Sequence, residues 1–134
     1  MPGRAIGVHV RERWMAADHA LQRFIICGDV VVTGGTATTV ATLKLALPSY
    51  DAARVHGYAL STLSAAAVAR GVFFMTLSRR RRLVGMPAGR ADVFPAGALA
   101  LTGFLEKLGA DSAVVCAQGV RYGVAYRYFE DENR

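Results

Sequence analysis

A chain of 134 residues is long enough for one domain and too short for two. Its 16 basic and 10 acidic side chains give a formal charge of +6, which favours anionic partners without choosing among nucleic acid, membrane and polyphosphate. The apolar fraction of 53% indicates an alanine-rich helical domain or a face that docks on a partner. Val93–Leu105 is too short for a membrane span, and Tyr58–Leu77 contains Arg70. Because Met1–Arg13 lacks the apolar centre of a secretory signal, we expect a cytoplasmic protein without a membrane partner.

The first part of the chain alternates between helix and strand. Apolar residues at helical spacing predict a helix over Glu12–Phe24. The β-branched run Val30–Val32, bounded by glycines on both sides, predicts a buried strand. A glycine-rich turn over Thr33–Thr38 follows the strand, and a helix then runs to about Leu47, where Pro48 ends it.

The middle of the chain predicts a short extended segment or loop over Val55–Leu60, followed by a helix over Ser61–Leu77. The hydroxyl of Ser61 can cap this helix. Next comes the densest basic cluster, Arg79–Arg82. We interpret this cluster as a solvated turn between helices, with contact to phosphate as the alternative.

The clearest helix of the sequence covers Asp92–Leu108. Asp92 suits its cap, Pro95 suits its first turn, and Gly109 suits its end. The apolar run Ala113–Ala117 then predicts a second buried strand.

The chain closes with a short helix or strand over Val120–Tyr128. Apolar strands separated by helices predict a single α/β domain over residues 1–134, in which a few parallel strands are covered by helices. Two or three strands are few for such a sheet, so we expect a further part to complete it.

The strongest local motif is the segment Thr33-Gly34-Gly35-Thr36-Ala37-Thr38 between a strand and a helix. The two glycines leave the backbone open, and free amides at a helix start favour an anionic or nucleotide group. Thr36 and Thr38 can add hydroxyl donors. The motif is not a Walker A loop, because no Gly-Lys-Ser/Thr follows. Taken alone, it also suits a tight strand-to-helix turn that requires small residues.

Further segments follow this turn in a specific order along the chain. They are Leu47–Asp51, Arg54–Ser61, Arg90–Ala98 and Gln118–Gly123. This series, from about Val30 to Val124, resembles the second half of the exopolyphosphatase / guanosine pentaphosphate phosphohydrolase family. The order of the segments, more than any one of them, carries the resemblance.

The resemblance implies an actin/Hsp70/sugar-kinase type fold, in which two ribonuclease H-like domains clamp a phosphate-bearing substrate. This chain would be a partial second domain. Family members hydrolyse terminal phosphates of polyphosphate or guanosine pentaphosphate, usually with magnesium. Gly34–Thr38 resembles the phosphate-facing turn of the second domain, and Arg90 resembles a family arginine that meets the anionic chain. The alternative for Arg90 is a structural pair with Asp92 or with a backbone carbonyl.

His56 and Arg121 are further candidates for the site. His56 has no visible nucleophile or metal partner, so a structural hydrogen bond in its His-Gly turn is favoured. Arg121 follows a strand and can pair with a carboxylate or a phosphate. Tyr122 stands where the family usually has a glutamate, so the contacts that close the site differ here.

The sequence lacks the family's Asp-Ile-Gly-Ser-Asn-like phosphate loop and the glutamate taken as its base. Neither Cys27 nor Cys116 has metal-site spacing, and no carboxylate cluster marks a magnesium site. We therefore expect that the first domain is absent, that no catalytic or metal-binding residue is present, and that the chain is inactive alone. A missing first domain or a second copy of the chain is the expected partner. The alternative function is a non-catalytic regulatory module that binds a polyanion or a nucleotide.

Overall fold

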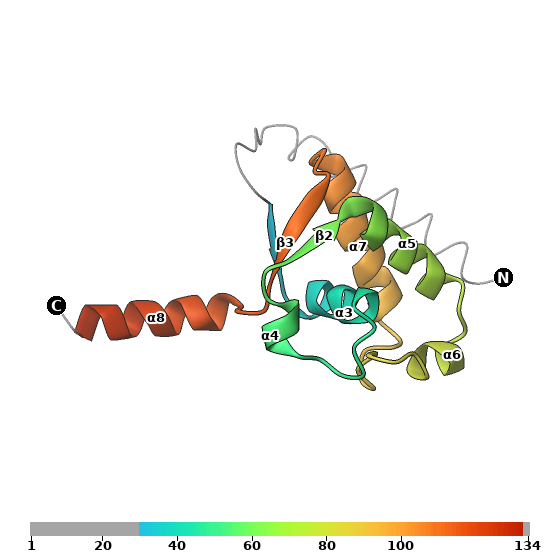
Figure 1. Ribbon diagram of the computed structural model, residues 1–134, viewed down its shortest axis with the longest axis horizontal. Coiled ribbons are helices and arrows are strands. Elements are labelled where there is room, and N and C mark those ends of the chain that lie inside the picture. The colour runs from blue at the N-terminus through green and yellow to red at the C-terminus, as the bar shows by residue number, and fades with distance from the viewer. Residues whose placement is uncertain (1–29, 133–134) are drawn as a thin grey trace.

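The computed structural model describes residues 30–132, so the predicted helix over Glu12–Phe24 and Cys27 lie outside the described residues. Figure 1 shows the strands and the helices that follow each of them along the chain. In chain order the elements are β1 (Val31–Thr33), α3 (Gly35–Lys44), α4 (Ala52–Val55), β2 (Tyr58–Ser61), α5 (Thr62–Phe73), α6 (Leu77–Arg81), α7 (Phe94–Lys107), β3 (Ser112–Cys116) and α8 (Val120–Glu132). The predicted α/β fold class is confirmed.

The three described strands form one sheet in the order β1-β3-β2. β1 runs parallel to β3, as the apolar pattern predicted, and Val32 lies opposite Val115. β2 runs antiparallel to β3, with Leu60 opposite Ala113. The sheet is therefore mixed, and the segment expected as an extended stretch or loop forms its antiparallel edge.

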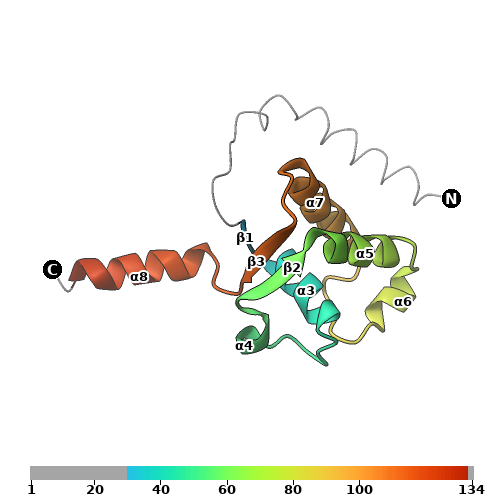
Figure 2. The same cartoon turned by 45° about the horizontal axis from the view of Figure 1, so that its top comes forward.

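Helices α3, α5 and α7 lie on one face of the sheet (Figures 1 and 2). Val32 and Val115 point toward these helices and are buried. Val31, Val114 and Ala59 are neighbours in register on the opposite face, where Val31 is 62% exposed and Ala59 is also exposed. The prediction that the first strand is fully buried was therefore wrong, because side chains alternate between a covered and an open face.

Helix α3 begins directly after Gly34, so the predicted turn over Thr33–Thr38 is largely the first turn of this helix. Gly34 has φ 100° and ψ 171°, a conformation open essentially to glycine alone. The helix ends before Pro48. Ala46 takes a positive φ of 50°, and the Leu47 amide donates to the Thr42 carbonyl at 3.1 Å. This hydrogen bond closes a Schellman motif.

Helix α7 begins two residues later than its predicted cap. Asp92 accepts a hydrogen bond from the neighbouring Val93 amide at 3.0 Å, and no side chain caps the helix, so Asp92 is not the helix cap. The predicted stop at Gly109 is confirmed, with φ 64° and a hydrogen bond from the Ala110 amide to the Leu105 carbonyl at 3.0 Å.

The starts of α3 and α7 pack closely against each other. A β-carbon on Gly97 of α7 would lie 2.6 Å from the hydroxyl oxygen of Thr36 in α3. Glycine at position 97 therefore sets how near these two helix starts can approach.

The cap of α5 is confirmed, because the Ser61 hydroxyl accepts from the Ser64 amide at 3.1 Å. The arginine run, expected as a turn, forms most of the short helix α6. Helix α8 runs away from the body of the structure (Figures 1 and 2), and all of its side chains from 120 to 129 are exposed. Within residues 30–132, no helix has the length and apolar character that a membrane crossing requires.

Candidate anion-binding site

A pocket of about 600 Å³ opens where the parallel strands β1 and β3 end and helix α3 begins. The volume lies within the range of roughly 300–1,000 Å³ usual for small-molecule sites. In α/β folds ligands bind outside the carboxyl ends of the strands, which is where this pocket lies. Its lining residues come from β1, α3, the segments that join the elements and the first turn of α8: Thr33, Gly34, Gly35, Thr38, Thr39, Thr42, Tyr50, Pro87, Arg90, Ala117, Gly119, Val120 and Arg121.

The start of α3 offers free backbone donors to this pocket. No side chain caps the helix, and its first turn contains no acidic residue. The Thr38 amide is the first to reach an acceptor of the helix, the Gly34 carbonyl, at 3.1 Å. The amides before it have no partner within the helix, and the helix dipole places partial positive charge there.

Arg90 lies directly against this helix start. A β-carbon on Gly35 would lie 1.4 Å from the Nη1 atom of Arg90 and 2.1 Å from its Cζ atom. Within the described part of the chain, the Arg90 guanidinium has neither a hydrogen bond nor an ion pair, so the alternative pairing with Asp92 or a carbonyl is not observed there. A cation at the positive end of a helix is unfavourable unless an anion neutralises both.

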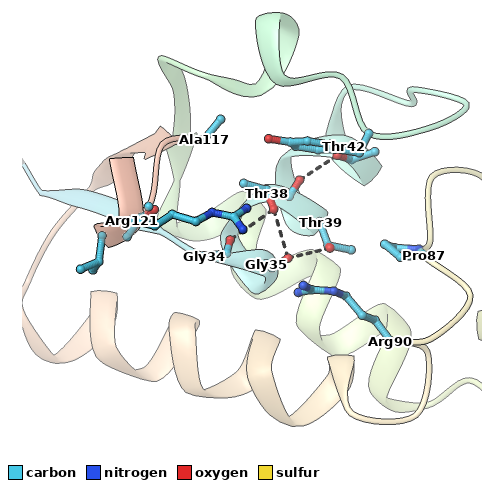
Figure 3. Close-up of a pocket in the computed structure, with 13 residues that line it drawn as sticks. Gly34, Gly35, Thr38, Thr39, Thr42, Pro87, Arg90, Ala117 and Arg121 are labelled. Carbon is cyan, nitrogen blue, oxygen red and sulfur yellow. Dashed lines mark hydrogen bonds between the residues drawn. The ribbon is translucent and has the colours of Figure 1, made fainter. Parts of the chain in front are cut away.

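Arg121 approaches the same place from the other side. Figure 3 shows its side chain directed from the first turn of α8 toward Gly34 and Thr38, whereas Arg90 reaches Gly35 from the segment before α7. No carboxylate is among the described residues that line the pocket. The pocket therefore combines two guanidinium groups with a helix start, and it lacks any acidic side chain to neutralise them.

The threonines behave differently from the prediction that Thr36 and Thr38 donate to a ligand. The Thr38 hydroxyl lies 3.2 Å from the carbonyl oxygens of Gly34 and Gly35, to which it can donate. Thr36 does not line the pocket and faces Gly97 of α7 instead. Thr39 donates to the Gly35 carbonyl at 2.7 Å. These hydroxyl protons serve the helix backbone, which leaves the hydroxyl oxygens as acceptors.

His56 does not line the pocket. Its Nδ1 atom accepts a hydrogen bond from the Ala117 amide at 3.2 Å, so His56 makes a structural hydrogen bond, but its partner lies outside the His-Gly turn. Since Ala117 lines the pocket, this hydrogen bond ties His56 to one residue of the pocket wall.

Sequence reasoning missed several lining residues, among them Thr42, Tyr50 and Pro87. Thr42 lies four residues after Thr38 and shares its helix face, so helical periodicity could have indicated it. Tyr50 and Pro87 carry no such signal, because loops bring them to the site.

Magnesium prefers oxygen ligands that include carboxylates. The lining residues supply guanidinium groups, hydroxyls and backbone atoms, and no carboxylate is among them. Residues 30–132 also contain no group of three His, Cys, Asp or Glu side chains that could hold a metal ion. The described residues alone therefore do not fit a magnesium site.

The mixed sheet, the helices on its covered face and the site at the strand ends belong to the actin/Hsp70/sugar-kinase type of fold. The sequence profile of the Ppx/GppA phosphatase family matches residues 10–132, and the chain belongs to this family. The resemblance drawn from the ordered segments is thereby confirmed.

Individual relatives agree with this assignment. Over 95 residues the chain is 30% identical to exopolyphosphatase 2 of Mycobacterium tuberculosis, an alignment that covers 68% of this chain and 30% of that protein. The crystal structure of the Ppx/GppA family member from Aquifex aeolicus matches with a TM-score of 0.83 and 25% identity, over 94% of this chain and 41% of that one. An exopolyphosphatase from Cytophaga hutchinsonii supports the fold alone, with a TM-score of 0.77 at 16% identity, over 95% of this chain and 42% of that one. The chain thus spans about a third of its curated relative.

Proposed function

We propose that this chain forms the phosphate-binding wall of an exopolyphosphatase-type phosphohydrolase and contributes to the hydrolysis of terminal phosphates from polyphosphate. One observation carries the proposal: the guanidinium of Arg90, which has no partner among the described residues, lies on Gly35 at the uncapped start of α3. Membership of the Ppx/GppA family and the likeness to a protein named exopolyphosphatase support the same substrate class.

A phosphate chain suits the donors of this pocket. A guanidinium donates two parallel hydrogen bonds to phosphate oxygens, and amides at a helix start donate further ones. An anion between Arg90 and α3 converts the repulsion between the guanidinium and the helix dipole into two attractions. Arg121 can then hold a second phosphoryl group, which distinguishes a phosphate chain from a single phosphate ion.

The proposed role of this chain is binding, without turnover by the chain alone. Phosphoryl transfer requires a group that positions and activates the attacking water, besides charge stabilisation. No carboxylate or histidine is among the described residues that line the pocket. A further domain, or a second copy of the chain, would supply the opposite wall of the cleft.

Calorimetric titration of the full chain with tripolyphosphate tests the binding function. We expect saturable binding at low salt that weakens as salt rises. Arg90→Ala should weaken it by about a hundredfold, with residual binding to Arg121 and the start of α3, whereas Arg70→Ala, which removes an exposed arginine of α5 outside the pocket, should leave it unchanged. Absence of binding, or an equal loss in both variants, would contradict the proposal.

Two further arms test the substrate and the division of labour. Tight binding of guanosine pentaphosphate without binding of tripolyphosphate would favour the nucleotide-binding module over the proposed function. The chain alone should release no orthophosphate from polyphosphate in the presence of magnesium, and rapid release would overturn the claim that it only binds.

A further inference from the structure

One arginine of the basic run differs from its neighbours. Arg79, Arg81 and Arg82 are exposed, whereas Arg80 is partly buried. The Nη1 atom of Arg80 donates to the Ala91 carbonyl at 2.8 Å and to the Asp92 carbonyl at 3.3 Å. These carbonyls directly follow Arg90 in the chain. A single side chain of α6 therefore reaches the segment that carries the pocket arginine.

The backbone around Arg90 explains why the Ala91 carbonyl takes a side-chain donor. The Phe94 amide donates to the Arg90 carbonyl at 2.8 Å. The next hydrogen bond in this helical ladder would join the nitrogen of Pro95 to the Ala91 carbonyl, and proline has no N–H. Ala91 is only 1% exposed, so water is a poor substitute. Arg80 supplies the donor that Pro95 lacks.

We propose that Arg80 is a positioning residue for the anion site, which fixes the turn that presents Arg90 to Gly35. This inference rests on the proposed function. The turn is held from its other end by the Arg90 amide, which donates to the Pro87 carbonyl at 3.0 Å. The hydrogen bonds of Arg80 therefore hold one end of the turn, and the bond to Pro87 holds the other. The backbone that carries the Arg90 side chain is thereby fixed.

The burial of Arg80 supports a specific role over a general contribution to charge. Its Nε atom is buried and has no hydrogen-bond partner among the described residues. An unsatisfied buried donor is costly. The hydrogen bonds to the Ala91 and Asp92 carbonyls offset that cost. If Arg80 only added positive charge near the anion site, an exposed side chain would serve equally well.

The first experiment titrates the full chain with tripolyphosphate. Arg80→Met keeps most of the side-chain length and removes the donors, and we expect about tenfold weaker binding. Arg80→Lys restores one donor group and should recover part of the affinity. Arg79→Met and Arg81→Met remove the same charge from exposed positions and should bind like the wild type. Equal losses of affinity in all three methionine variants would show that Arg80 contributes only its charge, and would overturn the proposal.

Two double-variant cycles identify the route by which Arg80 acts. In an Arg90→Ala background, Arg80→Met should cause no further loss, because a positioning residue acts through Arg90. In a Pro95→Ala background, residue 95 gains an N–H for the Ala91 carbonyl, so Arg80→Met should cost far less affinity than in the wild type. Independent effects in both cycles would overturn the proposal. The Pro95→Ala background also serves if Arg80→Met alone does not fold.

A ligand-free measurement separates this inference from the proposed function. Hydrogen exchange of the Phe94 amide, which bonds to the Arg90 carbonyl, should be about tenfold faster in Arg80→Met and near wild type in Arg79→Met. If the wild type binds no tripolyphosphate, the proposed function fails while the exchange rate still decides whether Arg80 holds the turn. Unchanged exchange at Phe94 overturns the role of Arg80, whatever the affinity.

Discussion

The guanidinium of Arg90 occupies the space in which a side chain at Gly35 would begin. Gly35 does not have a positive φ, so its backbone accepts alanine. Any side chain there must displace the far end of Arg90, which is flexible. A substitution at Gly35 should therefore change the position of the Arg90 guanidinium, with little effect on the stability of the fold.

Gly35→Ala is expected to separate binding from stability. Affinity for tripolyphosphate should fall by about tenfold, because Arg90 is pushed off the helix start. The melting temperature should stay the same or rise slightly, since alanine favours helix. Gly71→Ala in α5, where a new β-carbon meets nothing within 4 Å, is the matched control and should not alter affinity. Unchanged affinity in Gly35→Ala would show that the Arg90 contact is irrelevant to the ligand.

Arg121 and Arg127 lie on the same helix, and only Arg121 lines the pocket. Arg121→Ala should weaken binding of tripolyphosphate by about tenfold, because a charge-assisted hydrogen bond to a phosphoryl group is lost. Arg127→Ala removes the same charge from an exposed position and should have little effect. Calorimetric titration measures both. Binding of orthophosphate should be less sensitive to Arg121→Ala, and equal sensitivity would argue against a second phosphoryl position.

Gly97→Ala should destabilise the protein by about 1–3 kcal/mol, because the new methyl group overpacks the contact between α3 and α7. Thr36→Ala removes the atoms that the methyl would strike, so the double variant should recover most of the loss. Gly103→Ala, on the same helix and with nothing within 4 Å of its new β-carbon, should be neutral or stabilising. Chemical denaturation measures all four proteins. A destabilised double variant would place the strain elsewhere.

Ala46→Gly should stabilise the protein by about 1 kcal/mol. Ala46 has a φ of 50° in the Schellman motif that ends α3, a position that strongly favours glycine. Ala100→Gly, in the interior of α7, should destabilise by a similar amount, since glycine weakens a helix. Opposite shifts in the denaturation midpoint are the expected result, and a loss of stability in Ala46→Gly would contradict it.

Much of the fold could be predicted from the sequence because local rules decide it. Ser61 caps a helix with its own hydroxyl, and Gly109 ends one with a positive φ. The register of the sheet could not be predicted, because β2 pairs antiparallel through residues far away in the chain. The exposure of Val31 depends on which face the helices cover, and a uniformly apolar strand does not reveal this.

The candidate site was predicted in part for similar reasons. Residue type alone indicated Gly34, Gly35 and Arg90, because glycines leave the backbone amides open and a guanidinium suits phosphate oxygens. All three line the pocket. Thr36 and Thr38 look equivalent in the motif, but helix α3 begins at Gly35 and turns Thr36 toward α7. The role of Arg80 depends on Pro95, fifteen residues later, which lacks the N–H that the Ala91 carbonyl would otherwise accept. Nothing in the sequence alone connects these two residues.

One residue that lines the pocket, Arg121, is carried by helix α8, which the rest of the described chain scarcely touches. Its 13 residues start immediately after Gly119, with Arg121 in the first turn and Tyr126, Tyr128 and Phe129 exposed further along. A helix moves as a rod, so any tilt at its base swings the guanidinium of Arg121 across the mouth of the pocket. A contact made by the aromatic side chains near the end of α8 would therefore also determine where the Arg121 guanidinium lies in the pocket.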